Sequence, residues 1–535
     1  MYDLLIVGGG IVGCGCARDA AMRGLSVCLV DQNDIAFGTS SRSSKLVHGG
    51  LRYLEQGEFS LVFEAVTERR VLMDIAPHLV NPLGFLFPVY KKSRRGVFTV
   101  NLGMWLYDGL SLFRTPRIHR NLSSKDVAKE EPALTQVDLK GAPLYYDCAT
   151  DDARLTLENA MDAARMGAEI RTWTRVVGFT RDTTGRVTGA TVRDELSGVE
   201  SVIDARAVIN ATGPWTDATR GIGKTHAHVL RPTKGVHIVV DRARLPVTNA
   251  VVCFHPTDGR VLFAIPWGDR TYVGTTDTDW SGDPALVAAD AADVGYLLAA
   301  ANSYFPAAKL VTDDVIATWA GLRPLIAQDG KASSVSREHE VIVDPDGLIT
   351  VAGGKLTTYR KMAKDVVDRA VALLRLTAGL AHELREAHTA RNPLPGAVGW
   401  PEDDDQARVE AAIRAAGPAD EATARLFAVT YGTRGTDVAA RMLANPALAA
   451  PLVAGRPERL AQVDWAVDME LAKTVTDVMV RRTQLYFRDH DQGLAAVELV
   501  AARMAEKLGW DDARRAREVS AYREEVARSR AWRTA

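Results

Sequence analysis

A glycine-rich turn between an apolar run and a helical pattern constrains the fold of this chain most strongly. Residues 3–7 form a short apolar run, residues 8–13 read Gly-Gly-Gly-Ile-Val-Gly, and a second apolar run covers residues 25–30. Short continuous apolar runs are expected for strands of a parallel sheet that is covered on both faces. The pattern predicts a strand at 3–7, a helix at 11–23 and a strand at 25–30, which together form a Rossmann-like β-α-β unit.

This turn has the chemistry of a dinucleotide site. Its glycines let the backbone approach a pyrophosphate without a Cβ in the way, and the first turn of the helix offers free N–H groups to that anion. An aspartate at the end of the second strand can accept both ribose hydroxyls. Such turns also serve plain strand-to-helix packing, but the order strand, helix, strand and acid favours a dinucleotide. The predicted contacts of this unit are Gly8, Gly10, Ile11, Val12, Gly13 and Asp31.

The glycine turn alone does not separate FAD from NAD, and three later segments favour FAD. Residues 37–50 combine five Ser/Thr residues with three glycines, residues 210–213 end a predicted strand with Asn-Ala-Thr-Gly, and residues 353–355 read Gly-Gly-Lys between a strand and a helix. A helix N-terminus at the last segment can face the flavin ring. The further predicted cofactor contacts are Thr39, Ser40, Ser44, Leu46, His48, Gly49, Gly50, Gly213, Gly354, Lys355, Leu356 and Thr357.

A chain of 535 residues is too long to fold around a single hydrophobic core, so several domains are expected. Residues 236–240, 261–265 and 271–275 alternate as antiparallel strands do, and residues 391–402 are rich in Pro and Gly before a helical pattern that runs to the end. We predict a discontinuous FAD-binding domain (1–80, 145–225 and 341–375), an antiparallel-sheet substrate domain (81–144 and 226–340) and an all-helical C-terminal domain (391–535).

Several ordered segments resemble the FAD-dependent, respiratory glycerol-3-phosphate dehydrogenases. They are SSRSSKLVHGGLRYLE (40–55), IPWGDRTYVGTTDTD (265–279), AGLRPL (320–325), GGKLTTYRKMA (353–363) and the C-terminal segment 466–483. The resemblance covers nearly the whole chain and implies a D-amino acid oxidase-like FAD-binding fold. It also implies oxidation of sn-glycerol 3-phosphate to dihydroxyacetone phosphate, with hydride transfer to FAD and electrons passed to a membrane quinone.

The resemblance also implies roles for individual residues. Arginines suit a phosphate dianion because their planar forks bind oxygens in pairs, and fixed donors suit an alcohol oxygen that gains negative charge. A histidine with an ordinary pKa near ~6.5 can accept the hydroxyl proton. The implied catalytic residues are His237, Lys355, Arg323 and His48, and the implied substrate-binding residues are Arg52, Tyr53 and Arg337. The alternative is a purely structural role, in which His237 is a core histidine with its hydrogen bonds made and Arg337 is a solvated loop residue.

Three rival functions stay open from the sequence. A glycerol-3-phosphate oxidase shares the fold and substrate but passes electrons to oxygen. An amine or amino-acid oxidase of the same fold binds a carboxylate, which the number of arginines and lysines near the predicted site disfavours. A non-catalytic flavin-binding protein is the third alternative, and the full set of predicted active-site groups disfavours it.

The net charge and the cysteine content limit the binding partners and the cellular compartment that we expect for this protein. The net charge of −2 gives no electrostatic reason to expect nucleic acid, and five cysteines without metal-ligand spacing predict no metal site and fit the cytoplasm. The basic residues Lys91, Lys92, Arg94 and Arg95 precede an apolar, aromatic stretch at 97–113. This pattern is typical of a protein on the inner face of the cytoplasmic membrane, and equally of an ordinary buried helix beside a loop. Whether the chain forms a homodimer is open.

Overall fold

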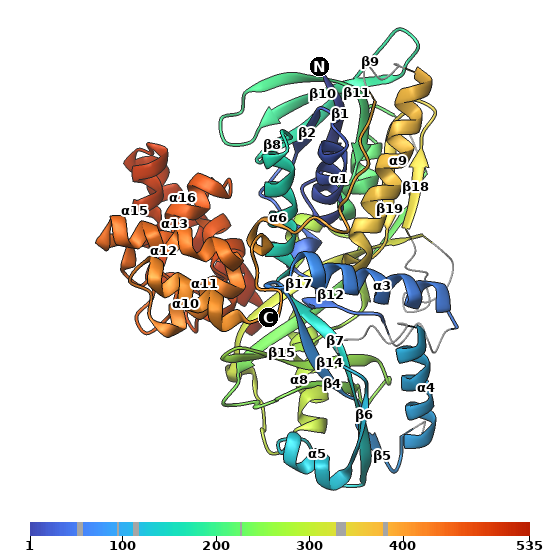
Figure 1. The fold of residues 1–535 in the computed structure, drawn as a ribbon, viewed down its shortest axis with the longest axis vertical. Helices are drawn as coiled ribbons and strands as arrows, with labels where there is room; N and C mark the ends of the chain where they lie inside the picture. The colour runs from blue at the N-terminus through green and yellow to red at the C-terminus, as the bar shows by residue number, and fades with distance from the viewer. Residues whose placement is uncertain are drawn as a thin grey trace.

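The molecule has three parts in this computed structural model, which describes residues 1–50, 57–93, 96–110, 117–224, 227–327, 339–377 and 383–534. Two parts built on β-sheets are stacked along the long axis, and a helical part lies beside them (Figure 1). The predicted architecture is thereby confirmed. Within these ranges no helix is both long and apolar enough to cross a bilayer.

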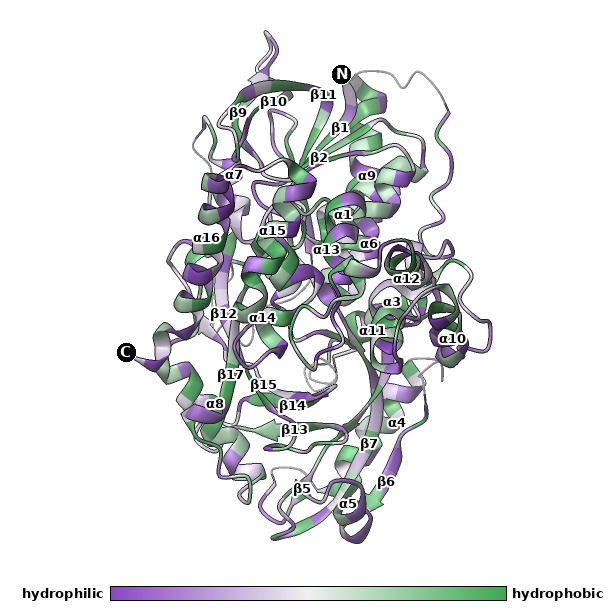
Figure 2. Ribbon diagram, turned by 90° about the vertical axis from the view of Figure 1, so that its left-hand side faces the viewer, coloured by the Kyte–Doolittle hydropathy of each residue, from purple (hydrophilic) through white to green (hydrophobic). Residues whose placement is uncertain are grey.

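The first sheet contains the predicted β-α-β unit. Eight described strands form it, with β1 in parallel between β2 and β11, and with β19 parallel to β11. Helices α1 (Ile11–Met22), α6 (Asp152–Arg165) and α9 (Tyr359–Thr377) cover one face, and strands β9 and β10 lie over the other. Figure 2 shows β1 and β2 in the hydrophobic colour, as burial on both faces requires. The strands are β1 (Tyr2–Val7), β2 (Val27–Val30), β8 (Glu169–Arg171), β9 (Thr174–Arg181), β10 (Val187–Asp194), β11 (Glu200–Asn210), β18 (His339–Val343) and β19 (Ile349–Gly353).

The second sheet is antiparallel except where β4 runs parallel to β13. Helix α8 (Ala291–Tyr304) packs on one face, with α3 (Phe59–Ile75) and α4 (Val97–Leu110) on the other. The sheet reaches back to residues 46–47, earlier in the chain than the predicted boundary at 81, because β3 pairs with β7. Its strands are β3 (Leu46–Val47), β4 (Val80–Leu86), β5 (Val89–Tyr90), β6 (Arg120–Ser123), β7 (Leu139–Thr150), β12 (Leu230–Asp241), β13 (Ala250–Phe254), β14 (Val261–Trp267), β15 (Arg270–Gly274), β16 (Thr278–Asp279) and β17 (Val315–Ile326). Two short helices, α5 (Ser124–Glu130) and α7 (Thr216–Arg220), complete the first two parts.

The third part is the predicted C-terminal helical domain. Its core continues into that of the second sheet, since Trp319 of β17 and Phe487 of α14 meet edge to face with ring centroids 5.6 Å apart. A π-helical turn, Asp477–Arg482, interrupts the regular helices. The helices are α10 (Gln406–Ala416), α11 (Glu421–Tyr431), α12 (Gly435–Ala444), α13 (Ala461–Met469), α14 (Leu485–Arg488), α15 (Val497–Leu508) and α16 (Asp512–Arg530).

Candidate active site

A pocket lies between the two sheets, at the carboxyl ends of the parallel strands. Its walls come from the turns that follow β1, β2, β11 and β19, and from β12 and β17 of the second sheet. Ligands of open α/β sheets bind at this edge, because the loops that leave the strands converge there. The pocket therefore combines the predicted dinucleotide unit with the predicted substrate domain.

The glycine turn has the close backbone packing of a dinucleotide site, and its glycines serve different purposes. Gly8 has a φ of +113°, and a Cβ there would lie 2.5 Å from the carbonyl oxygen of Ala211. A Cβ on Gly13 would lie 1.9 Å from the carbonyl oxygen of Gly8, so Gly13 permits the turn itself and does not line the pocket. Gly10 faces the pocket, where a Cβ would meet only the Ser40 hydroxyl, at 3.3 Å. The first turn of α1 lines the pocket with Ile11 and Val12, and a helix N-terminus in this place suits a pyrophosphate.

The carboxylate of Asp31 stabilises this turn from the end of β2. Its Oδ2 accepts a hydrogen bond from Gly9 N at 2.6 Å, and its Oδ1 accepts one from Asn33 N at 2.8 Å. Burial raises the pKa of Asp31 to about 6, and the two N–H donors limit that rise. The carboxylate is mostly ionised at pH 7 and lines the pocket, where it can also accept ribose hydroxyls.

The polar segment 39–48 runs along the pocket and is tied to both ends of it. Ser40 Oγ accepts a hydrogen bond from Ile11 N at 2.9 Å, which joins this segment to the glycine turn. At the other end, Thr357 Oγ1 lies 3.2 Å from His48 N and 3.3 Å from His48 O. The early motif and the late glycine motif, about three hundred residues apart, are thus adjacent.

Most of the predicted cofactor residues line this pocket. Three do not: Gly13 belongs to the turn, Gly49 packs against Tyr107 with its N–H donated to the phenol oxygen at 3.0 Å, and Gly50 is buried with a φ of +75°. The residues that do line it are Gly8, Gly10, Ile11, Val12, Asp31, Thr39, Ser40, Ser44, Leu46, His48, Gly213, Gly354, Lys355, Leu356 and Thr357.

Strand β12 supplies His237 to the pocket and turns Lys234 away from it. Side chains alternate along a strand, so residues 235 and 237 share one face while residue 234 lies on the other. Lys234 donates to Asp290 at 2.7 Å and to Asp293 at 2.6 Å, both at the start of α8. Although Lys234 belongs to the same sequence motif as His237, it supports the fold on the far side of the sheet.

His237 is held rigidly and is neutral. Its ring stacks on Trp319, and its Nε2 lies 2.9 Å from the Ser44 hydroxyl. Burial lowers the pKa of His237 well below its ordinary value, and the positive charges of Arg323 and Lys45 lower it further. Within the described ranges its Nδ1 has no hydrogen-bond partner. The ring is therefore uncharged at neutral pH, the form that a general base needs.

Arg323 and Lys355 complete the set of polar groups around the pocket. Arg323 lies on β17, where its guanidinium contacts Asp277 Oδ1 and Thr275 Oγ1, each at 3.1 Å. Lys355 precedes the 3-10 turn Leu356–Thr358 and lines the same pocket. Arg52, Tyr53 and Arg337 lie outside the described residues, and so do Arg94 and Arg95 of the basic run.

Sequence reasoning missed pocket residues that lie inside the very motifs it used. A Cβ on Gly235 would lie 2.6 Å from Thr275 Oγ1 and 2.7 Å from Arg323 Nη2, so this glycine gives the arginine its position. The alternation of β12 could have revealed Gly235, since it shares a face with His237. Arg42 also lines the pocket, with its guanidinium 5.2 Å from the ring centre of Phe37, and no local pattern indicated this contact.

Comparison with known proteins relates the whole chain to FAD-dependent enzymes. A family model described as FAD dependent oxidoreductase matches residues 3–369, and a model described as the C-terminal domain of alpha-glycerophosphate oxidase matches residues 387–515. Glycerol-3-phosphate dehydrogenase 2 of Mycobacterium tuberculosis is 39% identical over 97% of this chain and 87% of its own length. Aerobic glycerol-3-phosphate dehydrogenase of Staphylococcus epidermidis is 38% identical over 98% and 93%. The X-ray structure of glycerol-3-phosphate dehydrogenase from Bacillus halodurans complexed with FAD has a TM-score of 0.79 and 33% identity, covering 99% of this chain and 95% of that one.

Proposed function

This chain belongs to the FAD-dependent glycerol-3-phosphate dehydrogenase family, and we propose that it passes the electrons from glycerol 3-phosphate to a membrane quinone. It is an FAD enzyme that oxidises glycerol 3-phosphate. The meeting of His237, Arg323 and Lys355 with the glycine turn in one pocket supports the oxidation, and the exposed apolar face of α4 supports a membrane quinone as the acceptor.

The residues of the pocket divide the chemistry between them. FAD, when bound, accepts the hydride from the secondary carbon of the substrate. The neutral ring of His237 takes up the hydroxyl proton at Nε2, the nitrogen beside Ser44. Lys355 and Arg323 hold the oxygen as its negative charge grows. His48, beside Thr357, keeps the segment 39–48 in place around the reacting atoms.

The substrate phosphate is assigned to Arg52, Tyr53 and Arg337 by their motifs. A charge-assisted contact contributes on the order of 1.5–3 kcal/mol, so Arg337→Ala raises the KM for glycerol 3-phosphate roughly ten- to a hundredfold while the flavin spectrum stays unchanged. Oxidation of glycerol by the wild type at an equal rate would exclude a phosphate site.

The acceptor is tested by reoxidation. Glycerol 3-phosphate bleaches the flavin band under anaerobic conditions, and a short-chain quinone then restores it faster than air-saturated buffer does. Stoichiometric peroxide with oxygen alone favours the oxidase alternative. Bleaching by glycine or D-alanine favours the amino-acid oxidase alternative, and no bleaching by any of these favours a non-catalytic protein.

An apolar helix supports contact with a membrane surface. On α4, Phe98 is 80%, Leu102 62% and Trp105 51% exposed, and Lys91 and Lys92 lie exposed just before it. Apolar and aromatic side chains beside basic residues suit the interface of an anionic bilayer. The helix lies at the edge of the substrate domain, away from the C-terminal helical domain (Figure 1). A quinone carried by that bilayer is then near the enzyme.

A further inference from the structure

The loop after β2 forms one wall of the cofactor pocket. Asp31, Asn33 and Phe37 of this loop line the pocket, and Ala36 N donates to Gly9 O at 3.0 Å. With the bond from Gly9 N to Asp31, the loop and the glycine turn hold each other by backbone and carboxylate contacts. A shift of the loop therefore moves the backbone that faces the pyrophosphate.

Asp34 fixes this loop to the C-terminal domain through two arginines. Arg482 binds it with both ends of its guanidinium, Nη1 to Oδ2 and Nη2 to Oδ1, each at 2.8 Å. Arg481 Nε reaches Oδ2 at 2.5 Å. The side chains of Asp34 and Arg482 are 0% and 1% exposed, which leaves the ion pair unscreened by solvent. Burial by itself raises the pKa of Asp34, but the two guanidiniums bring it below its ordinary value.

The π-helical turn Asp477–Arg482 lets two consecutive arginines face one carboxylate. π turns are rare and are frequently found at functional sites. Arg481 also donates to Asp477 Oδ1 at 2.6 Å, and Arg482 donates to the carbonyl oxygen of Glu470 at 2.7 Å. Both arginines are thus held within their own domain as they bind Asp34.

The same segment also reaches the loop by a second route. Trp173 Nε1 donates to Asp477 Oδ2 at 3.2 Å, and Lys473 Nζ donates to Thr172 O at 3.1 Å. Trp173 N in turn donates to Asn33 O at 2.9 Å, and Thr174 N donates to Asp31 O at 2.6 Å. The C-terminal domain therefore holds the loop both at its side chain and along its backbone.

We propose that Arg481 and Arg482 are positioning residues for FAD, through which the C-terminal domain holds the Asp31–Phe37 loop against the glycine turn. Neither arginine lines the pocket. Both act through Asp34, and Arg481 also lies over the ring of Phe37, with its Cζ 5.7 Å from the ring centre. The proposal depends on FAD as cofactor but on neither the substrate nor the electron acceptor. It gives the C-terminal domain a role in cofactor retention.

The test measures FAD binding to the full-length apoprotein by quenching of flavin fluorescence, without substrate. Arg482→Gln removes the paired contact and is expected to raise the Kd for FAD roughly 5- to 150-fold, the range of coupling between linked sites. Arg482→Lys keeps the charge but loses the fork and is expected to lie between that variant and the wild type.

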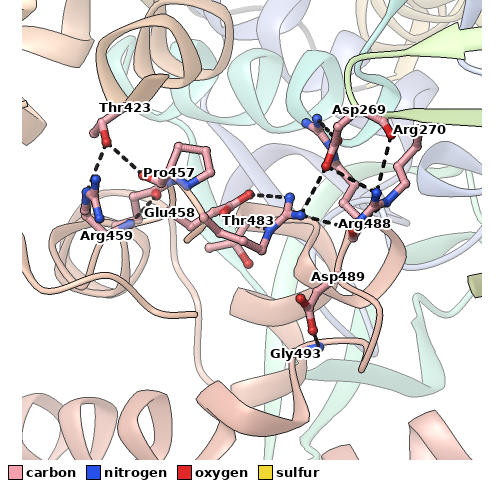
Figure 3. Close-up of polar contacts among 12 residues, drawn as sticks. Asp269, Arg270, Thr423, Pro457, Glu458, Arg459, Thr483, Arg488, Asp489 and Gly493 are labelled. Carbon is pink, nitrogen blue, oxygen red and sulfur yellow. Dashed lines mark hydrogen bonds and ion pairs between the residues drawn. The ribbon is translucent and has the colours of Figure 1, made fainter. Parts of the chain in front are cut away.

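Two control variants distinguish release of the Asp31–Phe37 loop from a general loss of protein stability. Arg488→Gln removes a contact of the same domain with the other sheet, where Arg488 Nη2 lies 2.9 Å from Asp269 Oδ1 (Figure 3). Arg503→Gln removes a paired contact inside the domain, with Asp464, at 2.5 Å for both bonds. Both controls are expected to lower the melting temperature of the apoprotein but to leave the Kd for FAD within about twofold.

An unchanged Kd for FAD in Arg482→Gln overturns the proposal, and so does an equal rise in the controls. If Arg482→Gln does not fold because the buried Asp34 keeps only Arg481 as a cationic partner, Arg482→Lys is measured in its place, and a wild-type Kd there overturns the proposal equally. Linkage supplies an independent readout: FAD slows hydrogen exchange of residues 473–484 in the wild type, and less so in Arg482→Lys.

Discussion

His237 lies face to face with Trp319, with ring centroids 4.7 Å apart and an angle of 14° between the ring planes. The indole in turn donates from Nε1 to Ser43 O at 3.0 Å, so the stack is fixed to the segment that lines the pocket. A stacked imidazole keeps one orientation, and its Nε2 stays beside Ser44. This fixed orientation fits the proposed role of His237 as the base.

Replacing His237 tests its role as the base. In His237→Gln a general base is lost, and the rate of flavin bleaching in a single turnover is expected to fall ~10²–10⁴-fold. Ser44→Ala removes the contact to Nε2, worth about 1 kcal/mol, so the rate at saturating FAD is expected to fall roughly fivefold. Bleaching of His237→Gln at the wild-type rate would transfer the role to His48 or Lys355.

The acid side of the wild-type pH profile follows from the same environment. Burial, aided by two nearby cations, lowers the pKa of His237 well below its ordinary value, so the neutral, proton-accepting form persists as the pH falls through ~6.5. The rate of bleaching is therefore expected to stay level from pH 8 to below pH 6.5 and to decline only in more acidic buffer. An inflection near pH 6.5 that disappears in His237→Gln contradicts this.

Two glycines of the turn are expected to respond differently to the same substitution. Gly10→Ala adds a Cβ that meets only Ser40 Oγ at 3.3 Å within the protein, so the apoprotein keeps its melting temperature while FAD affinity falls. Gly13→Ala adds a Cβ 1.9 Å from the carbonyl oxygen of Gly8, so the turn itself is displaced and the apoprotein melts lower. Thermal melts of apoprotein and FAD titrations distinguish the two. Equal loss of stability in both variants contradicts the assignment.

The sequence predicted those features of the fold that depend on residues close together in the chain. The β-α-β unit, the late glycine motif and the helical domain were predicted because each depends on spacing within a few residues. Alternation along β12 could also have separated Lys234 from His237. The contact between Asp34 and Arg482 could not be predicted, because 448 residues separate the two and no local sequence pattern indicates that they pair. Long-range pairs of this kind are decided by how the domains pack.

His78 is expected to make the fold sensitive to acid. Burial lowers its pKa to about 3, with the positive charges of Arg154 and Arg434 adding to the shift. The unfolded chain binds a proton below pH ~6.5 while the folded state does not, so stability falls by about 1.4 kcal/mol per pH unit below 6.5. His78→Leu removes this loss, so the melting temperature of the variant relative to that of the wild type should rise between pH 7 and pH 5. Parallel pH profiles contradict the prediction, whatever the packing effect of leucine.

The exposed face of α4 is expected to control membrane binding. Burying a large apolar side chain contributes about 1.5–3 kcal/mol, so the double variant Phe98→Gln/Leu102→Gln should lower the affinity for anionic liposomes, measured by sedimentation, roughly 10²–10⁴-fold. Quinone reduction in those liposomes should slow, and reduction of a soluble dye should not change, because α4 contributes nothing to the pocket.

The control and a second variant separate apolar from electrostatic contributions. Leu443→Gln alters a leucine of α12 that is 66% exposed on the C-terminal domain, and it should leave liposome binding unchanged. Neutralising Lys91, Lys92, Arg94 and Arg95 should weaken binding to anionic vesicles at low salt and have little effect at 1 M salt, where screening acts within about 3 Å. If the α4 variant sediments like the wild type, this helix is not the membrane contact, and quinone must reach the flavin from another face.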